Sequence, residues 1–125
     1  MIQVVAAVIL RGDEVLVTRR PRGGHMAGKW EFPGGKIEKG ETPRAALRRE
    51  ILEELGCRVS VGRRICRVCY RYPGKSVRLD FFRCRVLEGE PKGVEGQRVR
   101  WVKRADLRKL DFPPADREIL EHLSR

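Results

Sequence analysis

Apolar residues recur along the chain in runs of strand length, either continuous or alternating with polar residues. These runs lie at 3–10, 14–19, 57–62, 64–72, 76–86 and 97–103. The first two flank the turn Arg-Gly-Asp-Glu and are rich in β-branched residues, which predicts a β-hairpin. The runs at 64–72 and 76–86 are joined by Pro-Gly-Lys-Ser and predict a second pair of strands.

One stretch between these runs has helical spacing instead. Thr42 is a suitable N-cap, Pro43 suits the first helical position, and Gly56 suits the position after the last. The apolar residues of this helix share one face, at Ala46, Leu47, Ile51 and Leu55. Two short helices are expected near 104–110 and after 111–116. Strands mixed with such helices predict a single α/β domain with its sheet packed between helices.

Length and composition fit one domain that does not cross a membrane. The 125 residues are 41% hydrophobic and 36% charged, and every apolar run is far shorter than the ~20 residues that a bilayer crossing needs. The first residues lack the basic flank and the cleavage site of a secretory signal. We therefore expect a cytoplasmic protein.

The four cysteines raise the alternative of a zinc site. Cys66 and Cys69 have the C-x-x-C spacing of a zinc knuckle, but they fall in an alternating strand, which sends their sulfur atoms to opposite faces. We interpret all four cysteines as reduced structural thiols.

The formal net charge of +11 suggests a negatively charged partner. Excess positive charge attracts nucleic acids and small polyanions alike. Because the basic residues are spread from Arg11 to Arg125, an arginine-rich soluble surface without a specific partner is an equal alternative.

Three acids occupy an unfavourable place in the predicted helix. Glu50, Glu53 and Glu54 lie in its last turns, where the backbone dipole is negative, and their spacing puts them on one side. A divalent cation would reverse this repulsion, and oxygen ligands without His or Cys favour Mg²⁺ or Mn²⁺. The alternative is a solvated acidic face paired with Arg48 and Arg49.

The segment before the helix complements a metal held by these acids. Gly34 and Gly35 allow a phosphate to approach the backbone closely, and Lys36 supplies a cation. A polyphosphate between the two features is the expected ligand.

The residues from Gly35 to Cys57 resemble the Nudix box. Matching positions are Gly35, Glu41, Arg49, Glu50, Ile51, Glu53, Glu54 and Gly56, and only Cys57 departs, in place of the closing aliphatic residue. Residues 25–36, 89–97 and 111–116 also resemble the MutT group of that family. The resemblance implies a Nudix fold over 1–125, with a mixed sheet between helices. It also implies Mg²⁺-dependent hydrolysis of nucleoside triphosphates to monophosphate and pyrophosphate.

The resemblance assigns roles to individual residues. The metal ligands would be the carbonyl of Gly34 and the carboxylates of Glu50, Glu53, Glu54 and Glu95. Arg49 would orient the glutamates and Glu41 would brace the loop, while either Glu50 or Glu95 would remove the proton. Arg20 and Lys36 are candidates for holding the triphosphate.

The base-binding residues leave two substrates open. Glu31 and Phe32 agree with the group that removes 8-oxo-dGTP, but Asp116 stands where those relatives have an asparagine. An ionised carboxylate only accepts hydrogen bonds, which suits the amino group of cytosine or the N1–H and exocyclic amine of a guanine. A buried protonated carboxyl group also donates. Tyr72 and Trp30 are candidate stacking walls, with a core role as the alternative.

Two further alternatives concern activity and partners. A Nudix protein that lost catalysis and binds RNA or regulates is possible, although all four candidate acids are present. We expect a monomer that acts on a small nucleotide and needs neither a nucleic acid nor a membrane.

Overall fold

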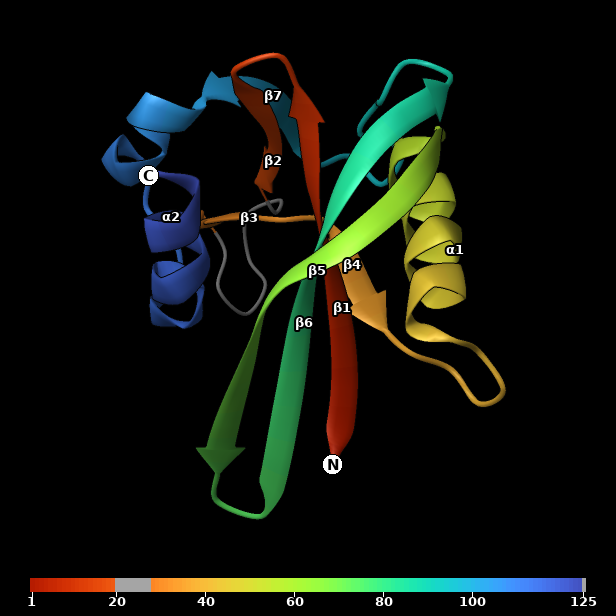
Figure 1. Cartoon of the computed structure of the whole chain (residues 1–125), viewed down its shortest axis with the longest axis vertical. Helices are drawn as coiled ribbons and strands as arrows, with labels where there is room; N and C mark the ends of the chain where they lie inside the picture. Colours follow the sequence, from red (N-terminus) through yellow and green to blue (C-terminus); the bar gives the residue numbers. More distant parts are fainter. Residues whose placement is uncertain (20–27, 125) are drawn as a thin grey trace.

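A mixed β-sheet separates α1 (Pro43–Leu55) on one side from α2 (Arg117–Leu123) on the other (Figure 1). The computed structural model describes residues 1–19 and 28–124. The strands are β1 (Ile2–Arg11), β2 (Glu14–Arg19), β3 (Trp30–Glu31), β4 (Gly34–Lys36), β5 (Arg58–Tyr72), β6 (Lys75–Glu88) and β7 (Arg98–Lys103). Two 3-10 helices, η1 (Arg104–Lys109) and η2 (Pro114–Asp116), precede α2. The predicted α/β architecture is confirmed.

The sheet is organised around β1, which pairs on both edges. It runs parallel to β6, from Ile2 opposite Val77 to Ile9 opposite Cys84. Its other edge pairs antiparallel with β4 and then, at Leu10 and Arg11, with β2. β6 also pairs with β5, and β2 with β3 and β7.

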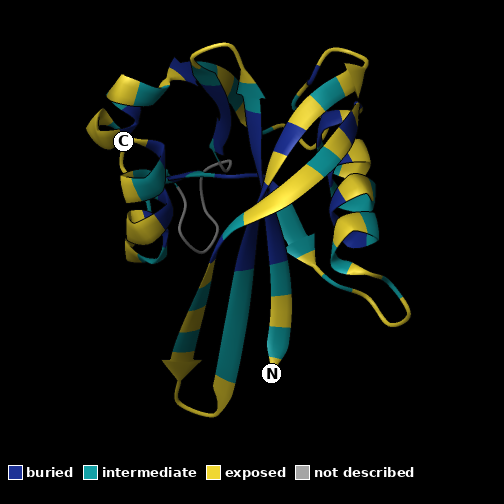
Figure 2. Cartoon of the chain, viewed as in Figure 1, coloured by how far each residue is buried: buried dark blue, intermediate teal, exposed yellow. Residues whose placement is uncertain are grey.

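Successive residues of β1 enter two different cores. Val5, Ala7 and Ile9 pack in the core beneath α1, whereas Ala6 and Val8 pack in the core that includes α2. A strand covered on both faces needs apolar residues at every position, which explains the continuous run in the sequence. Figure 2 shows the buried residues gathered in the middle of the molecule, with the far ends of β5 and β6 more exposed.

The boundaries predicted for the long helix are confirmed. Thr42 Oγ1 accepts a hydrogen bond from the backbone N–H of Ala45 at 3.1 Å. At the other end, Gly56 has a φ of 66° and its N–H donates to the carbonyl of Leu52. The predicted apolar face, Ala46, Leu47, Ile51 and Leu55, is buried.

The prediction of separate strands at 57–62 and 64–72 is wrong, because β5 is continuous. Its pairing with β6 shifts register between Val61 and Arg64 and again between Arg64 and Cys66. Such bulges bend a strand without ending its ladder. The helix predicted near 104–110 is the 3-10 helix η1.

Cys66 is buried and Cys69 is exposed, so the two residues of the C-x-x-C spacing differ in their surroundings as the strand pattern predicted, and all four thiols are free. Over residues 1–19 and 28–124, no helix combines the length and the apolar character that a membrane crossing requires.

The buried face of α1 predicts a specific stability difference. Ile51 is fully buried, whereas its neighbour Leu52 is 51% exposed. We expect Ile51→Ala to lower the free energy of unfolding by about 2–5 kcal/mol, because it leaves a cavity in the core. Urea unfolding measures the loss. Leu52→Ala is the matched control, and a comparable loss in both variants would contradict this packing.

Candidate active site

The site begins with the close approach of α1 to β4. A Cβ atom added to Gly35 would lie 2.4 Å from the Cδ atom of Glu50, and one added to Gly34 would lie 2.0 Å from the carbonyl oxygen of Val5. No larger side chain fits at either position without moving its neighbours. The glycine pair therefore brings the Glu50 carboxylate against the backbone of β4.

Arg49 holds this carboxylate and two others in place. Its Nε and Nη2 donate to both oxygens of Glu41, at 2.7 and 3.0 Å. Its Nη1 donates to Glu50 Oε1 at 3.0 Å and to Glu53 Oε2 at 3.3 Å. Nη2 also donates to the carbonyl of Lys36. The ion pairing expected of Arg49 is thus present, and it links α1 to the preceding loop.

Glu41 braces that loop. Its Oε1 accepts a hydrogen bond from the backbone N–H of Glu38 at 2.9 Å. The guanidinium of Arg49, followed by this N–H, holds the pKa of Glu41 below its usual value. Glu41 therefore stays ionised and anchors Arg49.

Glu54 lies in an environment of strongly negative electrostatic potential. Burial raises its pKa to about 8, and the carboxylates of Glu50, Glu95 and Glu31 add to the shift, while a hydrogen bond from the Gly34 backbone opposes it. Within the described part of the chain, Glu54 Oε2 is buried and has no hydrogen-bond partner. A buried carboxylate in this state needs a proton or a cation.

The loop before β7 brings Glu95 to this group. The backbone N–H groups of Lys92 and Val94 donate to the carbonyls of Leu55 and Glu54, at 2.9 and 3.2 Å. Gln97 Nε2 also donates to the Glu54 carbonyl, and Gln97 Oε1 accepts from the N–H of Glu95. The loop thereby satisfies the open carbonyls at the end of α1. The sequence interpretation missed Gln97, although it lies in the Val-Glu-Gly-Gln segment that carries Glu95.

Glu53 lies at the edge of the group. Its side chain is 56% exposed and contacts Arg49, whereas the side chain of Glu50 is only 18% exposed. The acids that act on Glu54 are Glu50, Glu95 and Glu31. The sequence interpretation placed Glu31 with the base rather than with the acids.

A cavity of about 230 Å³ adjoins the acids. Glu31, Gly34 and Gly35 line one part of it, and Asp116 and Phe32 also contribute. Phe32 stacks on Phe112 with ring centroids 5.3 Å apart and meets Phe81 edge to face at 5.8 Å. Leu79 and Phe81 complete an apolar wall that the sequence interpretation did not include. A wider cleft of about 580 Å³ near η2 is lined neither by Glu31 nor by the glycines of β4.

Asp116 is a buried acid in this cavity, with 6% of its surface exposed. Burial raises its pKa to about 7, and the charge of Glu31 adds to this effect. Near neutral pH, Asp116 therefore exists both as a carboxylic acid and as a carboxylate.

The other predicted binding residues lie elsewhere. Lys36 is exposed on β4, and Tyr72 is half exposed at the end of β5, outside the cavity lining. Trp30 is buried in the core that includes α2, as its alternative interpretation held. Arg20 lies outside the described residues.

The site is suited to a hard divalent cation. Its ligand atoms are carboxylate oxygens, and the unpartnered oxygen of Glu54 is buried among them. Carboxylates gathered beside a ligand-sized cavity are typical of the class of enzymes that use divalent cations to hydrolyse phosphate compounds.

Comparison with known proteins places the chain within that class. The NUDIX domain matches residues 4–122, so the chain belongs to the Nudix hydrolase family. Nudix hydrolases generally need a divalent metal ion.

Individual relatives cover nearly the whole chain. An 8-oxo-dGTP diphosphatase from Escherichia coli K12 is 41% identical over 123 residues, which are 97% of this chain and 95% of that protein. A CTP pyrophosphohydrolase from the same strain is 36% identical over 97% of this chain and 90% of its own. The crystal structure of a MutT protein from Methanosarcina mazei Go1 has a TM-score of 0.84 and 28% identity, covering 99% of this chain and 93% of that one.

Glu54 provides a test of the metal site that does not require activity. Its pKa rises from 4.5 to about 8 on folding, so the folded state holds the proton more tightly and stability falls as the pH rises between these values. At about pH 9 in metal-free buffer, we expect the free energy of unfolding of Glu54→Gln to be at least about 1 kcal/mol higher than that of the wild type. Urea unfolding measures the difference.

Adding Mg²⁺ should then stabilise the wild type more than Glu54→Gln, because the amide removes a charged ligand. Glu121→Gln, at an exposed acid of α2, is the control and should respond like the wild type. Equal stabilisation of wild type and Glu54→Gln by Mg²⁺ would exclude Glu54 from the metal site.

Proposed function

We propose that this enzyme hydrolyses nucleoside triphosphates to nucleoside monophosphate and pyrophosphate with Mg²⁺, or alternatively Mn²⁺. The main substrate would be 8-oxo-dGTP, whose removal from the nucleotide pool prevents mutation and so contributes to DNA repair. The observation that carries the proposal is that the acid cluster and the buried Asp116 meet at one cavity, through Glu31 and the glycines of β4.

The carboxylates of Glu50, Glu53, Glu54 and Glu95 and the carbonyl of Gly34 would hold the ions. Bound divalent ions would neutralise phosphate charge and make the attacking water more acidic. Arg49 keeps Glu50 and Glu53 oriented through its ion pairs, and the backbone N–H of Gly34 holds Glu54.

The chain's own residues would then position the triphosphate and move the proton. Lys36 and Arg20 would contact phosphate oxygens, so that water attacks the β-phosphorus. Either Glu50 or Glu95 would accept the proton of this water, and both lie beside Glu54.

Asp116 would read the base. As a buried acid with a pKa of about 7, it is partly protonated at neutral pH and can then donate one hydrogen bond and accept another. This is the hydrogen-bonding capacity of the asparagine amide that it replaces. Phe32 would pack beside the base, and its stacking on Phe112 keeps its ring in place. Tyr72 would contact the base only if the ligand reached the end of β5.

Hydrolysis of CTP or a modified pyrimidine triphosphate is the second candidate. The ionised form of Asp116 accepts from an amino group, as cytosine offers. A CTP pyrophosphohydrolase is among the relatives that match almost the whole chain.

A nucleotide panel tests the activity. We expect pyrophosphate release from 8-oxo-dGTP to require Mg²⁺ and to have the highest kcat/KM among 8-oxo-dGTP, dGTP, CTP and 5-substituted dCTP. Glu53→Gln should lower kcat at saturating Mg²⁺ by at least about 100-fold, because it removes a ligand charge. The control variant is Glu121→Gln, and circular dichroism verifies folding.

Release from none of these nucleotides, together with tight RNA binding in a gel shift, would favour the non-catalytic alternative. Near-normal turnover of Glu53→Gln would remove Glu53 from the metal site without affecting the rest of the proposal.

The titration of Asp116 predicts a change of selectivity with pH. The protonated form prevails below its pKa of about 7 and the ionised form above it. We expect the ratio of kcat/KM for 8-oxo-dGTP to that for CTP to fall as the pH rises through about 7. Taking a ratio cancels pH effects on the hydrolytic step that both substrates share.

Asp116→Asn is the matched variant for this experiment, because an amide does not titrate in this range. Its ratio should stay constant with pH and favour 8-oxo-dGTP. An identical pH dependence in variant and wild type would show that Asp116 does not read the base.

The setting that fits this activity is the cytoplasm, where the nucleotide pool is located. The four free thiols agree with a reducing compartment. We further propose that the protein acts as a monomer and needs no nucleic acid.

A further inference from the structure

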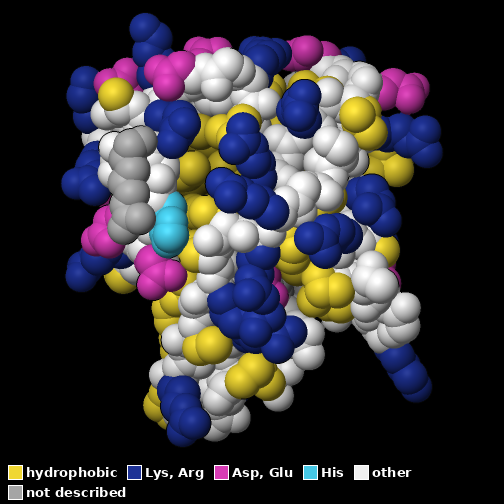
Figure 3. All heavy atoms as spheres, in the orientation of Figure 1, with side chains coloured by type: hydrophobic (Ala, Val, Ile, Leu, Met, Phe, Trp, Pro, Cys, Tyr) yellow, Lys and Arg dark blue, Asp and Glu magenta, His cyan; other side chains and the backbone are white. Residues whose placement is uncertain are grey.

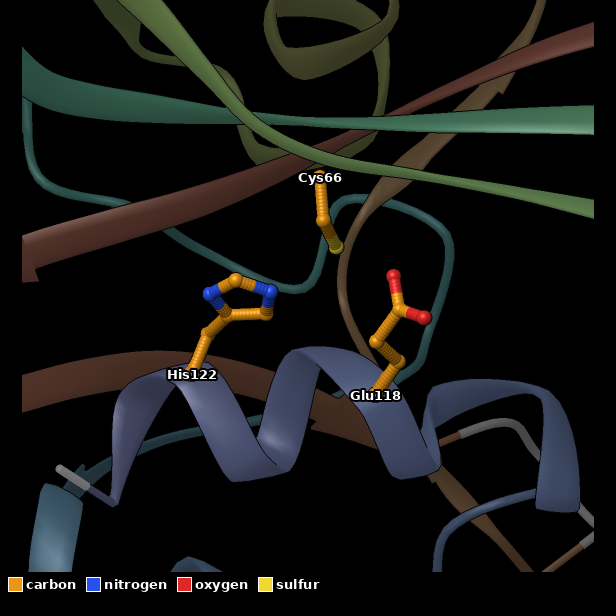
Figure 4. Close-up of side chains that lie close together, drawn as sticks. All are labelled: Cys66, Glu118 and His122. Carbon is orange, nitrogen blue, oxygen red and sulfur yellow. The ribbon is translucent and has the colours of Figure 1, made fainter.

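A second group of metal-ligating side chains lies between β5 and α2. Glu118 and His122 are one helical turn apart on α2, and both point toward Cys66 of β5 (Figure 4). The potential ligand atoms of the three residues all lie within 4.8 Å of one another. None of the three belongs to the acid cluster on α1 or to the cavity that adjoins it.

The spacing of the three ligand atoms approaches that of a tetrahedral zinc site. With zinc–ligand bonds of about 2.0–2.3 Å, neighbouring ligand atoms lie roughly 3.5 Å apart. Because the ligand atoms already lie within 4.8 Å of one another, small side-chain movements would close the group to that size. Glu118 is exposed and His122 is half-buried, so neither side chain is locked by packing on all sides.

The local charge also favours a cation. Lys and Arg side chains cover much of the face shown in Figure 3. The acidic groups that act on Cys66, however, are Glu118 first, then Asp80, which is ion-paired with Arg67 at 2.8 Å, and Asp116. The Glu118 carboxylate therefore places a negative charge beside the thiol, and a divalent cation would neutralise it.

We propose that Cys66, Glu118 and His122 form a second metal site, which takes a borderline-soft divalent ion of the zinc type. Sulfur and imidazole ligands select such an ion over Mg²⁺, which prefers oxygen ligands alone. Three protein ligands leave the fourth tetrahedral position to water. The C-x-x-C spacing does not predict this site, because the exposed Cys69 is not a ligand and the partners of Cys66 come from α2 instead.

Binding would proceed with loss of one proton. In the metal-free protein the Cys66 thiol donates to Glu118, and burial together with that carboxylate raises the pKa of the thiol to about 12. On binding, the S–H proton passes to solvent while the sulfur forms a bond to the metal, and the neutral imidazole and the carboxylate donate electron pairs.

The site would fix a short helix next to the base pocket. α2 has seven residues, too few for a stable helix on its own, and it directly follows Asp116. A metal that joins α2 to β5 would therefore hold the end of the chain that carries Asp116. This consequence does not depend on which nucleotide the enzyme hydrolyses.

Cobalt is the probe for the test, because Co²⁺ bound to a thiolate absorbs in the near ultraviolet by charge transfer from sulfur. Equimolar Co²⁺ is added to the reduced full-length protein in excess Mg²⁺, which occupies the carboxylate site on α1. We expect the charge-transfer band to appear and Zn²⁺ to remove it. Cys66→Ser should abolish the band, whereas Cys69→Ser, at the exposed cysteine on the same strand, should retain it.

His122→Gln provides an independent test, since His122 is only half-buried and its replacement leaves the core intact. This variant should bind Co²⁺ at least about tenfold more weakly, by spectroscopic titration. The proposal is overturned by the lack of a band in the wild type, by a band that persists in Cys66→Ser, or by unchanged affinity in His122→Gln. If Cys66→Ser fails to fold, the affinity of His122→Gln decides the outcome.

Discussion

The repulsion among carboxylates at the end of α1 is the constraint on which the site depends. Glu54 is buried next to Glu50, Glu95 and Glu31, at the end of the helix where the backbone dipole is also unfavourable for negative charge. The positive charge of Arg49 offsets the negative charges of Glu50 and Glu53. The Gly34 backbone donates a hydrogen bond to the Glu54 side chain, and the loop before β7 donates to the last carbonyls of α1. These contacts leave one buried oxygen of Glu54 without a partner among the described residues. An arrangement that is costly for stability in this way is characteristic of a site kept for its chemistry.

The rest of the fold holds this arrangement rigid. β1 lies between two cores and pairs along one edge with β4. The glycines of β4 lack side chains, which allows Glu50 and the backbone of Val5 to approach closely. Because α1 is anchored by a fully buried face, the carboxylates cannot separate by a movement of the helix. The same sheet brings the segment around Asp116, far along the chain, to the cavity beside the acids. The acids of the proposed metal site and the proposed base-binding residue are thus positioned by one set of packed strands.

Two acids in this protein have raised pKa values for related reasons but serve different ends. Glu54 is buried and surrounded by other carboxylates, whose repulsion a metal ion would relieve. The pKa of Asp116 is raised mainly by burial, and the charge of Glu31 adds to this shift. Its protonation therefore follows the solution pH, which makes it suitable for reading a base through hydrogen bonds. The different surroundings separate the two roles, although both side chains are carboxyl groups.

Sequence alone determined the features that depend on local spacing. The helix from Pro43 to Leu55, its N-cap, its terminal glycine and its row of acids follow from a period of 3.6 residues, which near neighbours in the chain establish. Whether an acid is buried, however, depends on which strands pack beside it. Only the tertiary structure therefore placed Glu31 among the acids, Gln97 against the end of α1, and Leu79 and Phe81 in the cavity wall.

The tertiary structure likewise joined Cys66 to Glu118 and His122, and it made β5 one strand where two were predicted. These outcomes depend on contacts between residues distant in the sequence. Side-chain packing selects such contacts, and a pattern of hydrophobic and polar positions does not contain them.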